Sequence, residues 1–68
     1  MPLITRPDVK LGEYIIRVQE IEHHNWSYAV YKKGKKWRKL RSIGFYLTPE
    51  AAERAGRHWL ANHLNLSR

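Results

Sequence analysis

The chain has 68 residues and no cysteine, and its 13 Lys and Arg outnumber its 6 Asp and Glu, giving a net charge of +7. This length leaves room for a single domain with one thin core, and the absence of cysteine excludes a disulfide framework and a thiolate metal site. Apolar stretches are far too short for a membrane span, and residues 1–12 lack the apolar stretch of a signal peptide.

The first twelve residues contain Pro2, Pro7 and Gly12 and show little apolar periodicity. We therefore expect residues 1–12 to form an extended arm or loose edge segment that packs against the body. Residues 13–66 are expected to form the single folded domain.

Two strands are predicted after the arm. EYIIRVQEI, starting at Glu13, has a period of two and β-branched residues, which are typical of a strand. Its two faces would carry Tyr14, Ile16 and Val18 on one side and Ile15, Arg17 and Gln19 on the other. The polar stretch EHHN predicts a loop, and WSYAVYK, starting at Trp26, predicts a second strand. Tyr28 and Val30 would face the core, whereas Tyr31 would face outward.

The next turn fixes the register of a third strand, expected from about Lys36 to Tyr46. Gly34 can take a positive φ, so KKGK predicts a hairpin turn. A three-residue loop, Lys33–Lys35, would pair Tyr31 with Trp37 and Ala29 with Lys39. This register places Trp37, Lys39 and Arg41 outside, whereas a two-residue loop would bury two charges.

A helix is predicted over TPEAAERAGRHWLANHL, with Thr48 as the N-cap and Pro49 at the first helical position. Small residues line one face of this helix, and Trp59 is expected to plug the space between helix and sheet. Leu60 and Leu64 lie on a neighbouring stripe, where they would permit a monomer or a weak dimer. The predicted fold is α+β: a three-stranded antiparallel sheet packed on one C-terminal helix (β-β-β-α), with an extended N-terminal arm.

The charge is concentrated in YKKGKKWRKLR, residues 31–41, where 7 of 11 residues are Lys or Arg. No acidic residue occurs between His23 and Pro49, so this segment should project a positive field that suits a polyanion. With the helix on one face, cationic and aromatic side chains would share the open face of the sheet. The predicted nucleic-acid-binding residues are Arg17, Gln19, Tyr31, Lys32, Lys33, Lys35, Lys36, Trp37, Arg38, Lys39 and Arg41.

Residues 28–60 carry a resemblance to known DNA-binding domains. An aromatic-rich strand, a Lys-Gly-Lys turn, a basic strand, Gly44-Phe45, Thr48 and the helix opening Glu50-Ala51-Ala52 follow one another. This order resembles the N-terminal arm-binding domains of tyrosine recombinases, the integrases of phages and transposons. It also resembles the plant ethylene-response-factor domain.

The resemblance covers about residues 13–64 and implies a sheet that sits in the major groove of duplex DNA. It would implicate Arg17, Gln19, Tyr31, Trp37, Lys39 and Arg41 in base contacts. The chain departs from the pattern by one extra residue between Phe45 and Thr48 and by the lack of a recombinase catalytic domain. We therefore expect an excised domain or a small phage or mobile-element accessory factor, cytoplasmic in a bacterial or phage-infected cell and nucleoid-associated when bound.

Two other functions stay open at this point. A small phage-type inhibitor could use the same charge to bind a protein partner, and RNA or single-stranded DNA could stack on Trp37 and Tyr31. An enzyme is not expected, because the serines have no accompanying His and Asp constellation. His23 and His24 would diverge as neighbours and His58 and His63 lie five apart, so no metal site and no cofactor are predicted.

Overall fold

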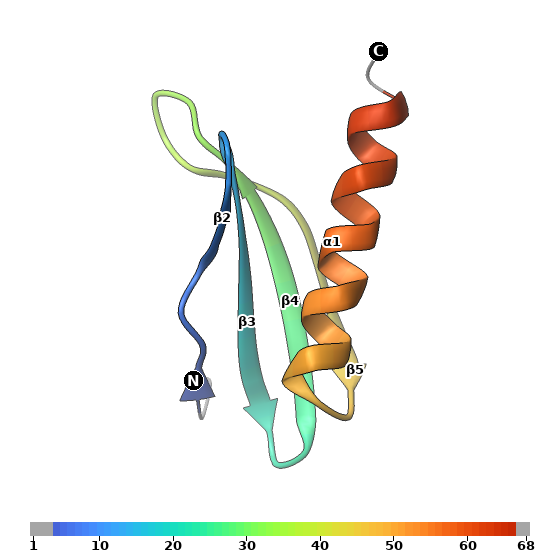
Figure 1. Cartoon of the computed structure of the whole chain (residues 1–68). Helices are drawn as coiled ribbons and strands as arrows, with labels where there is room; N and C mark the ends of the chain where they lie inside the picture. The colour runs from blue at the N-terminus through green and yellow to red at the C-terminus, as the bar shows by residue number, and fades with distance from the viewer. Residues whose placement is uncertain (1–3, 67–68) are drawn as a thin grey trace.

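The structure is a computed structural model that describes residues 4–66; residues 1–3 of the predicted arm lie outside the described part. Within it the chain forms five strands followed by one helix (Figure 1). Their bounds are β1 (Ile4–Thr5), β2 (Val9–Leu11), β3 (Tyr14–Glu22), β4 (Asn25–Lys32), β5 (Arg38–Tyr46) and α1 (Pro49–Leu66). Across residues 4–66, no helix is long and apolar enough to cross a membrane.

All strand pairs are antiparallel, in the order β1-β3-β4-β5, and β2 also pairs with β3. The predicted α+β class with one antiparallel sheet and one C-terminal helix is confirmed, but the prediction of three strands was wrong. Residues 4–11 pair with the free edge of β3 as two short strands, joined to it by a two-residue turn in which Gly12 has φ 62°. Such short segments leave no periodicity in the sequence.

The predicted register between β4 and β5 was also wrong. Lys32 pairs with Arg38 and Tyr31 with Lys39, so the loop has five residues, from Lys33 to Trp37. A bulge follows, because Val30 pairs with Arg41 and one extra residue, Leu40, lies between the two pairs. Lys39 lies on the open face opposite Tyr31, and Leu40 packs against the core, whereas the extra residue turns Arg41 to the core-facing side.

A second bulge lies near the end of the last strand. Tyr28 pairs with Ile43 and Trp26 with Tyr46, so β5 has an extra residue in this interval. Phe45 takes φ 73° there, a left-handed conformation that is rare for a bulky residue. Its N–H donates to Asn25 Oδ1 at 2.8 Å, which holds the bulge in place.

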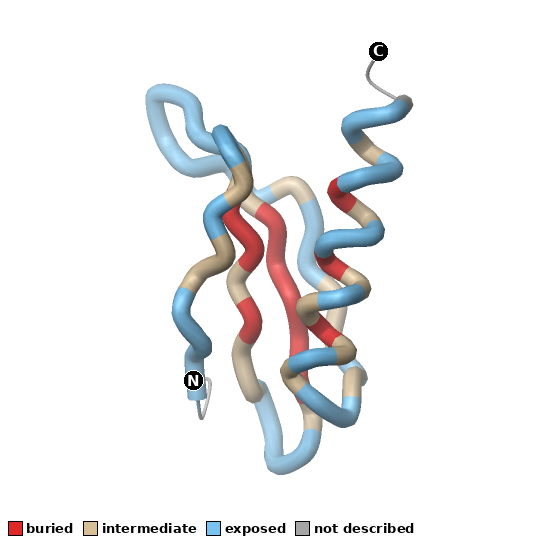
Figure 2. The backbone as a smooth tube through the Cα atoms, viewed as in Figure 1, coloured by how far each residue is buried: buried red, intermediate tan, exposed pale blue. Residues whose placement is uncertain are grey.

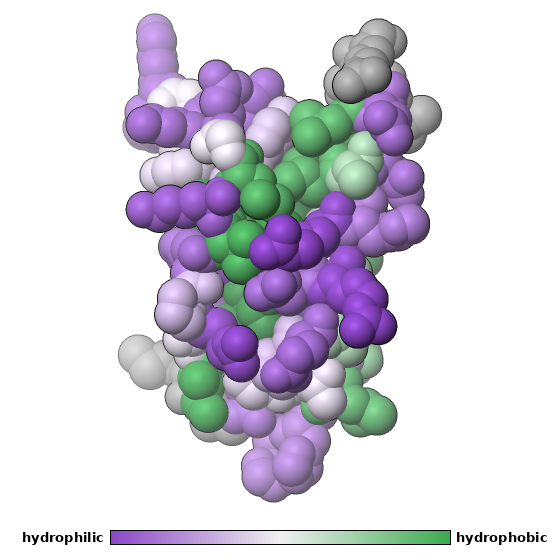
Figure 3. Space-filling model, viewed as in Figure 1, coloured by the Kyte–Doolittle hydropathy of each residue, from purple (hydrophilic) through white to green (hydrophobic). Residues whose placement is uncertain are grey.

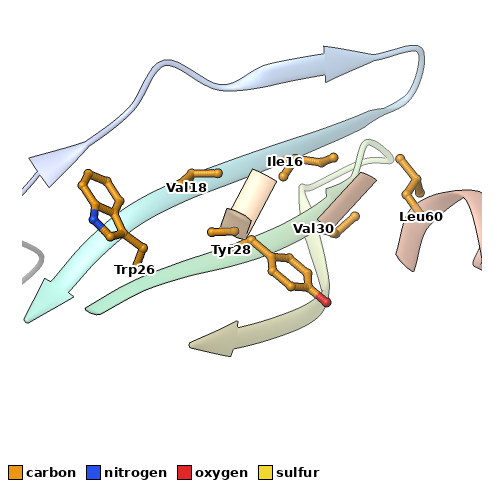
Figure 4. Packing of buried hydrophobic residues seen from close by; sticks show 7 residues of the cluster. Ile16, Val18, Trp26, Tyr28, Val30 and Leu60 are labelled. Carbon is orange, nitrogen blue, oxygen red and sulfur yellow. The ribbon is translucent and has the colours of Figure 1, made fainter. Parts of the chain in front are cut away.

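The core lies between α1 and one face of the sheet. Ile16, Val18, Trp26, Tyr28 and Val30 are buried there, as their alternation predicted (Figures 2 and 4). The opposite face of β3 and β4 has no helix over it.

The helix begins as predicted, since the Ala51 N–H donates to Thr48 Oγ1 at 3.1 Å. It approaches the sheet closely at Gly56. A Cβ at this position would lie 2.9 Å from Ile16 Cγ2 and 3.1 Å from Tyr28 Cδ2. Only glycine permits this approach without a shift of the β3–β4 pair.

The predicted roles of Trp59 and Leu60 were interchanged. Leu60 is only 3% exposed and belongs to the core, because its side chain reaches the sheet beside Gly56. Trp59 is half-buried at the margin, where it stacks on His63. Leu60 is therefore unavailable for a dimer contact, whereas Leu64 remains 41% exposed.

The close approach at Gly56 predicts that Gly56→Val is destabilised by about 1–3 kcal/mol, because the added side chain overpacks the helix–sheet contact. Ala61→Val is the matched control on the exposed side of α1, where only helix propensity, below about 0.7 kcal/mol, is affected. Urea unfolding of both variants measures the difference. Equal stabilities would contradict the close packing.

Candidate nucleic-acid interface

The open face presents side chains in rows that cross the strands. One row runs Lys10, Ile15, Tyr31 and Lys39 from β2 to β5. The next row contains Arg17, Ala29 and Ser42, and a third contains Thr5, Gln19 and Ser27. Four of the predicted binding residues, Arg17, Gln19, Tyr31 and Lys39, therefore do share the open face.

Arg17 is held in one orientation by the arm. Its Nε and Nη2 donate to the two Asp8 carboxylate oxygens at 3.1 and 3.2 Å. The side-chain hydrogen bonds to Asp8 raise the pKa of Arg17 above its ordinary value. Two of the five guanidinium N–H groups are used, which leaves three donors, on Nη1 and Nη2, for a ligand.

Tyr31 lies between two cations. The guanidinium carbon of Arg17 lies 5.2 Å from the ring centroid, and Lys39 Nζ lies 5.7 Å from it. Both distances fall within the range of a cation–π contact. The ring thus helps to hold two positive side chains together on the open face.

The β4–β5 loop carries the densest charge of the chain. Lys33, Lys35 and Lys36 are exposed at this end of the sheet, and the Lys33 N–H donates to the Glu13 carbonyl at 2.7 Å. That bond ties the loop to the β2–β3 turn. Trp37 ends the loop, 51% exposed, and lies beside Asp8, Lys10, Ile15, Arg17 and Tyr31.

Three predicted site residues do not lie on the open face. Arg41 was predicted there, but it pairs with Val30 and its guanidinium lies 5.9 Å from the Trp59 ring, on the helix side. The bulge at Leu40 is the reason for this reversal. Lys32 and Arg38 pair with each other, and Lys32 Nζ lies 5.8 Å from the ring of Tyr14, a residue packed on the core.

Charge is separated along the sheet. The basic β4–β5 loop lies at the opposite end from the β3–β4 turn (Figure 1). Glu20 and Glu22 lie at the turn end, and Glu50 and Glu53 are in the first turns of α1, which also begins at that end. Figure 3 shows hydrophilic side chains projecting around the loop. The loop end carries Glu13 in the β2–β3 turn as well, but its lysines give it a net positive charge.

The sequence prediction missed the contribution of the arm to this face. Lys10 extends the row of Tyr31 and Lys39, Asp8 orients Arg17, and Thr5 Oγ1 accepts a hydrogen bond from Gln19 Nε2 at 3.2 Å. The turn signal at Gly12 followed by a strand was the one sign that residues 9–11 pair with β3.

An apolar end of the sheet was also missed. Phe45 is 88% exposed and Leu47 is 78% exposed, and Ile21 is partly exposed beside Gly44. The exposure of Phe45 was not predicted, because a sequence does not show which residue of a bulge takes a positive φ.

Among the described residues, no group of three or more His, Asp or Glu side chains is placed to hold a metal ion. No family model, curated protein or solved structure matches the chain. The resemblance to integrase arm-binding and ethylene-response-factor domains therefore stays a prediction.

The Asp8–Arg17 pair is partly exposed, with side-chain exposures of 27% and 37%. At such exposure an ion pair contributes little to folding, so a double-mutant cycle with Asp8→Ala and Arg17→Ala should give a coupling energy below about 1 kcal/mol. Thermal unfolding of the four proteins measures it. A coupling of several kcal/mol would mean that the pair holds the arm on the sheet and does not mainly orient the guanidinium.

Proposed function

We propose that the chain binds duplex DNA by laying the open face of its sheet in the major groove. The observation that carries this proposal is the row from Lys10 to Lys39. Since neighbouring strands lie about 4.8 Å apart, the row spans about 14 Å between its two lysines. That span is close to the width of the major groove, about 12 Å, so the lysines suit phosphates on its two sides.

In this arrangement β3 follows the groove. Residues rise about 3.4 Å along a strand, and base pairs rise about 3.4 Å along DNA. Arg17 and Gln19 lie on one face two residues apart, so they would meet bases about two steps apart. Arginine can donate two hydrogen bonds to guanine, and glutamine can bond in the same bidentate way to adenine.

Asp8 assists Arg17 in this role. It occupies Nε and one N–H of Nη2, which leaves Nη1 and the second N–H of Nη2 for the two guanine acceptors. A fixed guanidinium loses less side-chain entropy when it binds. The loop lysines Lys33, Lys35 and Lys36 would contact the phosphate backbone beyond the sheet and contribute affinity that does not depend on sequence.

The biological role follows from the resemblance and belongs to the same proposal: an integrase arm-binding domain, or a phage or mobile-element accessory factor. The competing proposal is a small inhibitor that docks on a protein. The basic loop supports this alternative, because an acidic protein surface could bind its lysines in place of phosphates. The exposed Phe45 and Leu47 could add apolar contact.

The two kinds of basic residue should respond differently to substitution. Lys33→Ala with Lys35→Ala should weaken binding to every duplex about equally and flatten the log–log salt dependence by a slope of about 0.9 for each phosphate that is no longer neutralised. Arg17→Ala should cost about 1–3 kcal/mol on the preferred sequence and less on random DNA. Fluorescence anisotropy with both duplexes across a salt series measures these effects.

Arg54→Ala, on the exposed side of α1, serves as a charge-matched control that should leave sequence preference unchanged. Base reading by the sheet is refuted if Arg17→Ala lowers affinity for both duplexes in equal proportion. Tight binding to a protein together with no affinity for any DNA would favour the inhibitor.

A further inference from the structure

A hollow lies where the N-terminal arm meets the open face. Strands β2, β3 and β4, the link between β1 and β2, and the β4–β5 loop all contribute to it. Its lining is formed by Asp8, Lys10, Ile15, Arg17, Tyr31 and Trp37. DNA contact by an unbroken sheet does not require such a hollow, so its chemistry needs a separate explanation.

The lining combines a floor with an aromatic wall. Ile15 is buried at 7% exposure, and the Tyr31 ring contacts two cations. Trp37 leaves the strand because the loop has five residues, and half of its surface remains exposed although it lies against the hollow. The exposed indole offers an apolar surface on which a flat ring can stack.

The charges around the hollow narrow the class of ligand. Lys10 and Arg17 line it and Lys39 lies beside Tyr31, against a single carboxylate, Asp8. This excess of positive charge disfavours an ammonium ligand, which aromatic cages otherwise suit. Asp8 would repel a phosphate placed inside the hollow but can accept hydrogen bonds from ring N–H or amino groups. A nucleotide satisfies both the positive charge and the single carboxylate: its base places N–H donors inside the hollow, and its phosphates stay outside.

We propose that the hollow binds one unpaired nucleobase of DNA, stacked on Trp37 with its amino edge toward Asp8. The phosphate next to that base lies outside the hollow, near Lys10 at its edge. The inference rests on the proposed DNA binding and adds the class of site: DNA with a bulged or otherwise unpaired base. Removing a base from a perfect duplex costs free energy, so the protein should prefer DNA in which that cost is already met.

The test compares two duplexes of one sequence, one fully paired and one with a single extra 2-aminopurine bulge. Wild-type protein should bind the bulged duplex about 5- to 150-fold more tightly, the range that one base–aromatic stack supplies. The fluorescence of the 2-aminopurine should fall on binding, because stacking on an indole quenches it.

Variants of the loop separate stacking from charge. Trp37→Leu should abolish the preference for the bulged duplex and the quenching of the 2-aminopurine fluorescence. Trp37→Phe should retain most of both effects. Lys36 is a loop residue outside the hollow, so Lys36→Ala should weaken binding to both duplexes equally. Both positions are exposed, so folding should not be disturbed.

The outcomes distinguish this inference from the function on which it rests. Equal affinity for the two duplexes, or a preference that survives Trp37→Leu, would overturn the base-binding hollow and leave duplex binding intact. Failure of wild-type protein to bind either duplex would overturn the proposed function itself. A third duplex, the bulged sequence made as RNA, tests the choice of nucleic acid. Tighter binding to this RNA duplex than to the bulged DNA duplex would overturn the assignment to DNA.

Discussion

The close contact between α1 and the β3–β4 pair at Gly56 is the constraint on which the rest of the structure depends. Because the helix backbone lies almost on Ile16 and Tyr28, one helix is sufficient to cover one face of the sheet. Leu60 and Ala52 complete that contact on either side of the glycine. Within residues 4–66, no helix lies over the other face of β3 and β4.

The arm contributes side chains to the candidate site on this open face. It widens the sheet at the edge of β3, places Lys10 in line with Lys39, and holds the Arg17 guanidinium through Asp8. Two bulges in β5 complete the arrangement, because the first keeps Lys39 outside and moves Arg41 to the helix side. The basic residues of the segment 31–41 are therefore divided among the open face of the sheet, its helix side and the β4–β5 loop.

Much of the fold could be predicted from the sequence, since each correct element depends on local physics. Alternation identified β3 and β4, and the Thr48 cap with Pro49 identified the start of α1. The failures depend on contacts between distant residues. The pairing of residues 4–11 with β3, the five-residue loop and the bulge at Leu40 follow from the free edge and the core, which no local pattern contains.

The candidate site likewise contains residues that the sequence predicted correctly and residues that it did not. Arg17, Gln19, Tyr31 and Lys39 lie on the open face because alternation holds wherever the strand is regular. The prediction that Arg41 lies on the open face was wrong, because one extra residue in a strand turns every later side chain to the opposite face. Asp8 and Lys10 were missed because their place depends on the turn at Gly12.

NMR titration of labelled protein with duplex DNA shows directly whether DNA lies on the open face of the sheet. If it does, the amide signals of Arg17, Ala29, Tyr31, Lys39 and residues 33–37 should shift most. Those from Ala52 to Leu60 should change little. Largest shifts along α1, or at the apolar end around Phe45 and Leu47, would contradict binding through the open face.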